Sequence, residues 1–125
     1  MMGSTTDDDD DDAWVFYAEI AKGVNFDTVA REQRCKWSPD GDKAALQAAQ
    51  QVLNKHLPAL KKRGKVQRVV CGGCMDFKII TSMSADDFGK WEADGFAPEA
   101  DILKELGAIK GVTTIETQTF TLMPM

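Results

Sequence analysis

The pair Gly72-Gly73 stands between two segments of strand character, Lys65–Cys71 and Cys74–Met83. Adjacent glycines tolerate the positive φ angles of a tight turn, so the pattern predicts a β-hairpin with a two-residue turn. That turn places Cys71 opposite Cys74 in the register, with their α-carbons about 5.5 Å apart. One face of this hairpin is nearly all apolar, and the other is mostly polar. The apolar face comprises Val66, Arg68, Val70, Met75, Phe77, Ile79 and Met83; the polar face comprises Gln67, Val69, Cys71, Cys74, Asp76, Lys78, Ile80 and Ser82.

The residues before the hairpin predict a strand and a helix. Ala13–Ala21 is rich in aromatic and β-branched residues and predicts the first strand. The next stretch is less distinct, although Asn25–Arg34 fits a short helix. Asp42 is the expected N-cap of a longer helix from Lys43 to Leu57, which Pro58 should end or kink.

After the hairpin, Ser84 and Asp87 resemble a capping box that opens a helix. Pro98 suits the first position of a further helical segment, and Val112–Met123 has the threonine content of a strand. The predicted order is strand, helix, strand, strand, helix, strand. This order predicts an α+β, ferredoxin-like βαββαβ fold: a four-stranded antiparallel sheet with helices on one face.

Charge is concentrated at the start of the 125-residue chain, where Asp7–Asp12 is a run of aspartates. Like charges without an apolar face predict a disordered tail over residues 1–12, followed by one domain over residues 13–125. Without the run, the net charge of −5 becomes +1. We therefore expect no basic patch and no nucleic-acid partner. The sequence also lacks the long apolar run of a membrane-spanning helix.

Three cysteines are an odd number for so short a chain, which argues against a secreted disulfide framework. No basic start followed by an apolar stretch indicates a secretory signal. A cytoplasmic location is the resulting expectation.

The residues from Val66 to Leu122 carry short motifs of a known family. They are Gly73-Cys74-Met75-Asp76, Phe77-Lys78-Ile79-Ile80, Ser84-Ala85-Asp86-Asp87, Gly111-Val112 and Thr117-Gln118-Thr119. In this pattern the segment, a little under half of the chain, resembles the C-terminal ligand-binding module of the Lrp/AsnC regulators. That module belongs to the dimeric α/β-barrel superfamily.

The resemblance implies a homodimer of subunits packed sheet to sheet, with a small molecule bound near the β-turn or the subunit interface. Gly73 and Asp76 would line that pocket. The chain departs from the family in lacking a helix-turn-helix domain, so DNA binding is not implied. The family's turn also carries no cysteine pair.

Three functions remain open on the sequence. The first is a homodimeric small-molecule-binding or sensory module, with a ligand site formed by Gly73, Asp76, Cys71, Cys74 and Tyr17. The second is a small dimeric-barrel enzyme of the cofactor-free oxygenase, isomerase or cyclase type. Its acid–base candidates are His56, Asp76 and Tyr17.

The third function is a thiol redox or soft-metal protein that uses Cys71 and Cys74, whose predicted separation a disulfide can bridge. Two cysteines and one histidine cannot complete a tetrahedral zinc site, so these thiols are weak metal candidates. No cofactor is predicted. The ligand, and whether the chain is catalytic, do not follow from the sequence.

Overall fold

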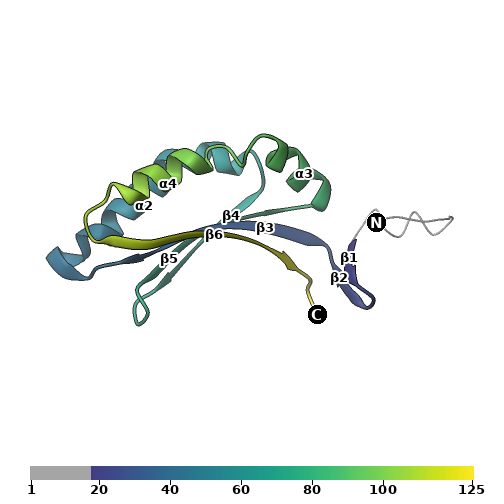
Figure 1. Ribbon diagram of the computed structural model, residues 1–125, viewed down its shortest axis with the longest axis horizontal. Coiled ribbons are helices and arrows are strands. Elements are labelled where there is room, and N and C mark those ends of the chain that lie inside the picture. The colour runs from purple at the N-terminus through teal and green to yellow at the C-terminus, as the bar shows by residue number, and fades with distance from the viewer. Residues whose placement is uncertain (1–17) are drawn as a thin grey trace.

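The protein is a two-layer molecule in which helices cover one face of an antiparallel sheet, leaving the other face without helices (Figure 1). The computed structural model describes residues 18–125. The elements are β1 (Ala18–Ala21), β2 (Val24–Phe26), β3 (Thr28–Trp37), α2 (Asp40–Lys61), β4 (Lys65–Cys71), β5 (Asp76–Met83), α3 (Ala85–Ala93), α4 (Glu99–Gly107) and β6 (Val112–Leu122). None of the described helices is long and apolar enough to cross a membrane.

The main sheet has the strand order β4-β5-β3-β6, and every neighbouring pair is antiparallel. β3 is the first strand of this sheet along the chain, yet it lies between the third and the last. The chain therefore runs strand, helix, strand, strand, helices, strand. The α+β class, the four-stranded antiparallel sheet and the helices on a single face are all confirmed.

The first strand of the sheet is not where the sequence placed it. The helix predicted over Asn25–Arg34 is wrong, because these residues contribute most of the central strand β3. Ala18–Ala21, the described end of the predicted first strand, instead pairs with β2 in a separate two-stranded sheet. Residues 13–17 of that prediction lie outside the described residues. β3 was missed because several of its side chains are charged, and partners on β5, β6 and α4 satisfy those charges.

The hairpin between β4 and β5 exists, but its predicted register is wrong by two residues. Cys71 pairs with Asp76 and Val70 with Phe77, so the turn contains residues 72–75. Met75 lies in this turn and not in β5, since its φ of 60° is left-handed and not that of an extended strand. A shift of two preserves the faces, because side chains alternate with a period of two. Phe77 accordingly lies in the core on the helix side, as predicted.

The long helix α2 extends beyond its predicted C-terminal end. Near its start, Gly41, Asp42 and Lys43 have left-handed backbone that is not part of a regular α-helix, so the regular helix begins after Lys43, close to the predicted start. Pro58 does not end the helix, which continues to Lys61. An exposed proline within a turn of the C-terminus is tolerated because it removes one backbone hydrogen bond without disturbing the packed face.

The capping prediction for α3 is confirmed, since Ser84 Oγ accepts a hydrogen bond from the Asp87 amide at 3.2 Å. Each of the three helices packs its apolar face against the sheet. The core comprises Val29, Cys35, Trp37, Ala45, Ala49, Leu53, Leu60, Phe77, Ile79, Met83, Phe88, Trp91, Ile102 and Leu106.

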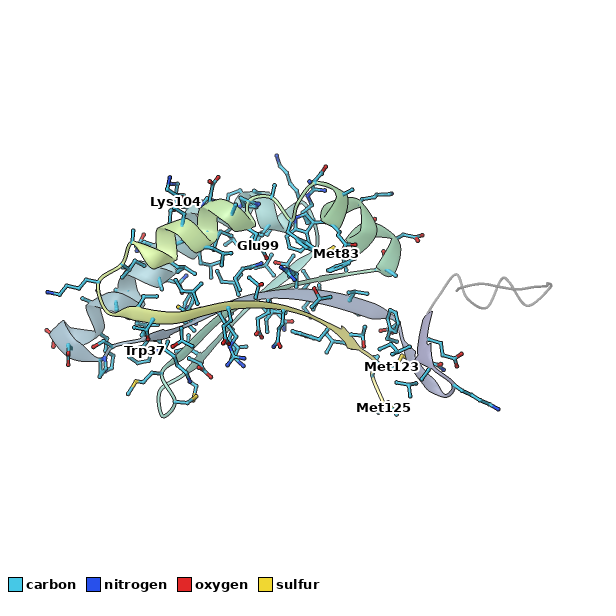
Figure 2. The ribbon with its side chains drawn as sticks, viewed as in Figure 1. Trp37, Met83, Glu99, Lys104, Met123 and Met125 are labelled. Carbon is cyan, nitrogen blue, oxygen red and sulfur yellow. A yellow bond between two sulfur atoms is a disulfide. The ribbon has the colours of Figure 1, made fainter. Side chains whose placement is uncertain are left out.

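One polar cluster is embedded in this interface, where the first turn of α4 meets β3. Figure 2 shows Glu99 between α4 and the sheet. Its carboxylate accepts hydrogen bonds from Arg31 at 2.8 and 3.0 Å and from Gln33 Nε2 at 2.8 Å. The Arg31 guanidinium also stacks 4.2 Å from the centre of the Phe96 ring. The cluster thus ties the start of α4 and the α3–α4 loop to the central strand.

Gly64→Ala is expected to lower the free energy of unfolding by about 2 kcal/mol, because a β-carbon at position 64 would collide with the Ser82 carbonyl oxygen. Gly89→Ala is the matched control: it lies in α3 with open space around it and should stabilise the protein by up to about 1 kcal/mol. Urea unfolding followed by circular dichroism measures both values. Equal effects at the two positions would contradict the close approach of Gly64 to β5.

Candidate functional site

The β4–β5 turn projects beyond the end of the sheet, away from the helices (Figure 1). Cys71 is the last residue of β4, and Cys74 lies in the turn. A disulfide joins the two, with their α-carbons 5.7 Å apart. Cys71 is half-buried and Cys74 is exposed, so the sulfur pair lies within reach of a reagent in solution.

The surroundings of the two sulfur atoms differ. The backbone N–H of Cys74 donates a hydrogen bond to Cys71 Sγ at 3.2 Å. Cys74 Sγ lies 3.3 Å from a carboxylate oxygen, Asp76 Oδ2. After reduction, the N–H would stabilise a thiolate on Cys71, whereas the carboxylate would favour a protonated thiol on Cys74 and accept its hydrogen bond.

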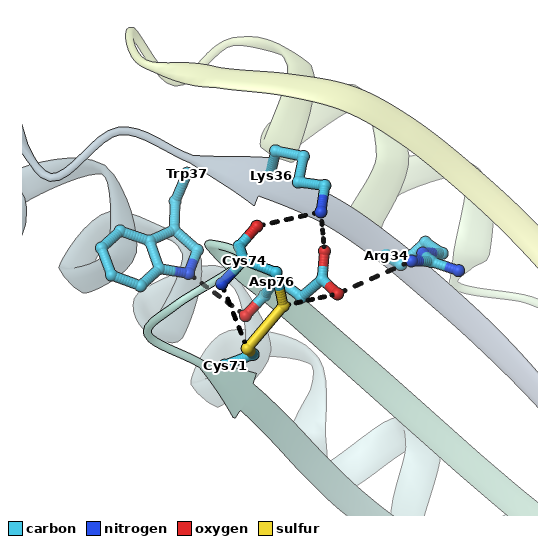
Figure 3. The surroundings of a disulfide bond; sticks show 6 residues. All are labelled: Arg34, Lys36, Trp37, Cys71, Cys74 and Asp76. Carbon is cyan, nitrogen blue, oxygen red and sulfur yellow. Dashed lines mark hydrogen bonds and ion pairs between the residues drawn. A yellow bond between two sulfur atoms is a disulfide. The ribbon is translucent and has the colours of Figure 1, made fainter.

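Asp76 is held at the centre of the site by cations from the neighbouring strand β3 (Figure 3). Lys36 Nζ lies 2.6 Å from Asp76 Oδ1 and donates to the Cys74 carbonyl oxygen at 2.9 Å. Arg34 lies 3.7 Å from Asp76 Oδ2. The hydrogen bond from Lys36 lowers the pKa of Asp76 below its ordinary value, with smaller contributions from the charges around it, although burial opposes the shift. Asp76 is therefore ionised at neutral pH.

Trp37 fixes the base of the turn to the central strand. Its indole Nε1 donates to the Asp76 carbonyl oxygen at 3.1 Å, and its backbone N–H donates to the Met75 carbonyl oxygen at 3.0 Å. The Trp37 side chain itself is buried in the core. The disulfide thus sits on a tip whose base is anchored in the folded body of the protein.

The pKa of Asp76 predicts how stability depends on pH. A carboxyl whose folded pKa is lowered stabilises the fold above its unfolded pKa, about 3.9, and this contribution is lost as the pH falls through the folded value. Asp76→Asn should therefore be less stable than the parent at neutral pH, with a difference that shrinks below about pH 4. Urea unfolding at a series of pH values tests this. Asp101→Asn, at an exposed position in no ion pair of the described residues, should show only the small pH-dependent difference expected of a charge in the first turn of α4. A difference for Asp76→Asn that persists at the acid end would contradict the shift in its pKa.

Beyond the turn, the sheet face opposite the helices carries a mixed set of side chains, which we term the helix-free face. Its residues are Lys65, Gln67, Val69 and Cys71; Asp76, Lys78, Ile80 and Ser82; Ala30, Glu32, Arg34 and Lys36; and Glu116, Gln118, Phe120 and Leu122. Glu32 is only 3% exposed and accepts a hydrogen bond from Gln118 at 2.9 Å. Arg34 lies near the carboxylates of Glu32, Asp76 and Glu116, at 3.8, 3.7 and 3.9 Å.

The structure does not bring all of the predicted site residues together. Cys71, Gly73, Cys74 and Asp76 lie together at the β4–β5 tip, although Cys71 faces Asp76 across the ladder and not Cys74. His56 lies on the helix side, where its Nε2 is 3.2 Å from Glu105 Oε2 of α4. Tyr17 lies outside the described residues. Of the acid–base candidates, the two described ones, His56 and Asp76, therefore lie apart, with His56 beside α4 and Asp76 on the helix-free face.

Neither a metal centre nor a third reactive thiol emerges in residues 18–125. No group of three or more His, Cys, Asp or Glu side chains in this range is placed to hold a metal ion. Cys35 is the free cysteine and is buried; burial, followed by the charge of Asp76, raises the pKa of its thiol to about 11. Cys35 is therefore a core residue and not part of the exposed pair.

Sequence reasoning missed Arg34, Lys36 and Trp37, because they fall in the segment that was not recognised as a strand. One signal was available: apolar Cys35 and Trp37 alternate with charged Arg34 and Lys36, which is the period of a half-buried strand.

Taken together, the fold and the tip describe a small α+β domain with a helix-free sheet face and an exposed disulfide. Among solved structures, it is similar to a NIPSNAP family protein with unknown function from Agrobacterium tumefaciens, at 13% identity and a TM-score of 0.50 over 77% of this chain and 88% of that one. A second NIPSNAP family protein from the same organism matches at 12% identity and a TM-score of 0.51, over 78% of this chain and 93% of the other.

No protein-family model matches the sequence, and no curated protein matches it either. The structural likenesses, at such low identity, confirm the α+β fold alone. The finer resemblance to the Lrp/AsnC module, including the dimeric barrel, stays a prediction.

Proposed function

We propose that the chain is a thiol–disulfide exchange module that works through Cys71 and Cys74. The observation that carries this proposal is the exposed disulfide between them, in which one sulfur accepts a backbone N–H and the other lies beside an ionised carboxylate. The two cysteines therefore suit different steps of thiol–disulfide exchange. One attacks the partner as a thiolate, and the other stays protonated until it resolves the mixed disulfide.

The exchange with a disulfide in a partner proceeds in two balanced steps. The Cys71 thiolate attacks one sulfur of the partner disulfide, which forms a Cys71–partner bond and releases the partner's other sulfur as a thiolate. The Cys74 thiol then gives up its proton, and its sulfur attacks Cys71 Sγ. The Cys71–Cys74 bond forms, the partner's second thiolate leaves, and two electrons have passed to the partner.

A pair that cycles must be reducible without unfolding its domain. The cysteines are three positions apart, so the closed loop is very short. On the chain-entropy model such a loop stabilises the fold by about 2 kcal/mol, which is less than the roughly 5–15 kcal/mol by which ordinary domains are stable. The core lies on the other side of the sheet and does not include either cysteine.

Equilibration in glutathione redox buffers, followed by alkylation and mass spectrometry, tests the proposal. We expect a reversible transition in which two thiols appear per chain, both within the peptide that spans residues 71–74, while circular dichroism stays unchanged. The proposal fails if the pair resists reduction until the domain unfolds, or if reoxidation does not restore the bond between Cys71 and Cys74.

A second candidate function is a homodimeric module that binds a small molecule through the helix-free face and the tip. It is favoured by the exposed apolar side chains of Val69 and Leu122 beside the charges of that face, a mixture typical of a wet interface. Gly73 and Asp76 would contribute to the ligand site. Light scattering at micromolar concentration and mass spectrometry of co-purifying small molecules test it; a monomer that carries no ligand would count against this second function.

A further inference from the structure

We propose that the partner of the disulfide is an acidic, extended polypeptide that pairs with the free edge of β4 and presents a cysteine to Cys71. This inference rests on the proposed thiol function and names its substrate class. β4 is an edge strand of the main sheet, with β5 as its one neighbour among the described strands. An edge strand offers unpaired backbone N–H and C=O groups that another chain can bond.

The disulfide lies at the end of this edge, so an added strand would pass directly beside it. Residues opposite each other on antiparallel strands have α-carbons about 4.5 to 5.5 Å apart. A disulfide needs about 4.4 to 6.8 Å. A partner cysteine in register with Cys71 therefore falls within bonding distance of it without movement of the backbone.

The side chains along β4 are available for such a contact. Val69 and Val70 are 40% and 41% exposed and point to opposite faces of the sheet, immediately before Cys71. Alternate apolar side chains of an added strand can pack against them, which supplies affinity beyond the backbone hydrogen bonds.

The charge of this region selects an acidic partner. From Lys43 to Met75 the sequence contains seven lysines and arginines and no acidic residue. Four of these cations lie along the edge or lead into it and form what we term the basic edge: Lys61, Lys62, Lys65 and Arg68, all exposed. None of the four takes part in an ion pair among the described residues, although Arg68 donates to Gln50.

Outside the Asp7–Asp12 run the net charge is only +1, so the expectation of no basic patch did not anticipate this local concentration of cations. Lysines on an edge strand repel strands of the same charge and attract those of the opposite charge. A nucleic acid could bind the cations of the basic edge, but it could not add a strand to β4 or react with the thiols. A polypeptide can do all three, whereas an oligonucleotide can do only the first.

Three nine-residue peptides test this inference on the reduced full chain. Each carries one cysteine blocked as a mixed disulfide with 5-thio-2-nitrobenzoate, whose release is coloured. The first alternates valine with glutamate, the second replaces glutamate by lysine, and the third interrupts the acidic peptide with proline. We expect the acidic peptide to react about tenfold faster than the lysine peptide, with the advantage lost at high salt. The proline peptide should be slow, because it cannot complete the ladder.

Charge-reversal variants test whether the preference for the acidic peptide depends on the basic edge or on positive charge anywhere on the surface. Lys62→Glu with Lys65→Glu should remove the preference for the acidic peptide, whereas Lys104→Glu on the outer side of α4 should leave it unchanged (Figure 2). Equal rates with all three peptides would overturn the partner inference while leaving the thiol function intact. A reduced protein that releases no colour from any peptide would overturn the thiol function itself. A single-stranded oligonucleotide that displaces the acidic peptide at matched charge would assign the edge to nucleic acid instead.

Discussion

Replacing Cys71 by serine is expected to slow the reaction of the reduced protein with a disulfide reagent by at least about 100-fold. Cys71 Sγ is the sulfur that accepts the Cys74 N–H, so its thiolate is the nucleophile of the first step. Cys74→Ser should leave this first step nearly intact but block the second, so the mixed disulfide on Cys71 should accumulate. Mass spectrometry of the quenched reaction detects that adduct directly.

Cys35→Ala provides the control for this experiment. The Cys35 thiol is buried in the core and its pKa is raised to about 11, so its loss should not change the reaction rate. Some loss of stability is expected from the smaller side chain, and circular dichroism will show whether the variant remains folded. The assignment of roles is contradicted if Cys74→Ser is the slow variant, or if the Cys71→Ser protein forms an adduct on Cys74 as fast as the parent reacts.

The second large effect concerns the polar cluster under α4. Glu99→Ala is expected to lower the free energy of unfolding by about 3 to 5 kcal/mol, because it leaves the guanidinium of Arg31 and the amide of Gln33 without their shared acceptor. Gln33 is fully buried and the Arg31 side chain is 17% exposed, so the amide in particular has no access to water in place of the carboxylate. Urea unfolding followed by tryptophan fluorescence measures the change.

Glu92→Ala is the matched control for this cluster. Glu92 is exposed on α3 and takes part in no ion pair of the described residues, so its loss should change stability by no more than about 0.5 kcal/mol. Glu99→Gln should fall between the two, since an amide oxygen can still accept one hydrogen bond but carries no charge for Arg31. A change below about 1 kcal/mol for Glu99→Ala would mean that the cluster is not the anchor of α4.

Side-chain alternation predicted the faces of the β4–β5 hairpin but not its register. Phe77 and Ile79 fall in the core as expected, because a strand has a period of two regardless of its pairing. The pairing depends on the turn, and the sequence did not reveal that Met75 adopts left-handed backbone and extends the turn to four residues. Adjacent glycines mark where a turn occurs, but not how many residues it contains.

The main error of the sequence prediction was to miss the central strand β3, and the site residues that β3 carries were missed with it. Arg34 and Lys36 look solvent-exposed in the sequence, but the fold pairs them with acidic residues on the two strands that flank β3. Such partners are distant along the chain, so local patterning cannot anticipate them. The cysteines and Asp76 could be predicted because they sit within one hairpin.

Nuclear magnetic resonance of the full chain, recorded before and after addition of a dithiol, shows whether Cys71 and Cys74 form a reversible redox pair in the folded protein. We expect the signals that change to belong to residues 71–76 and to the β3 residues bonded to them, Arg34, Lys36 and Trp37, and we expect reoxidation to restore the original spectrum. Signals from the helices should stay in place. A spectrum that does not respond to the dithiol, or one that collapses to that of an unfolded chain, would contradict this expectation.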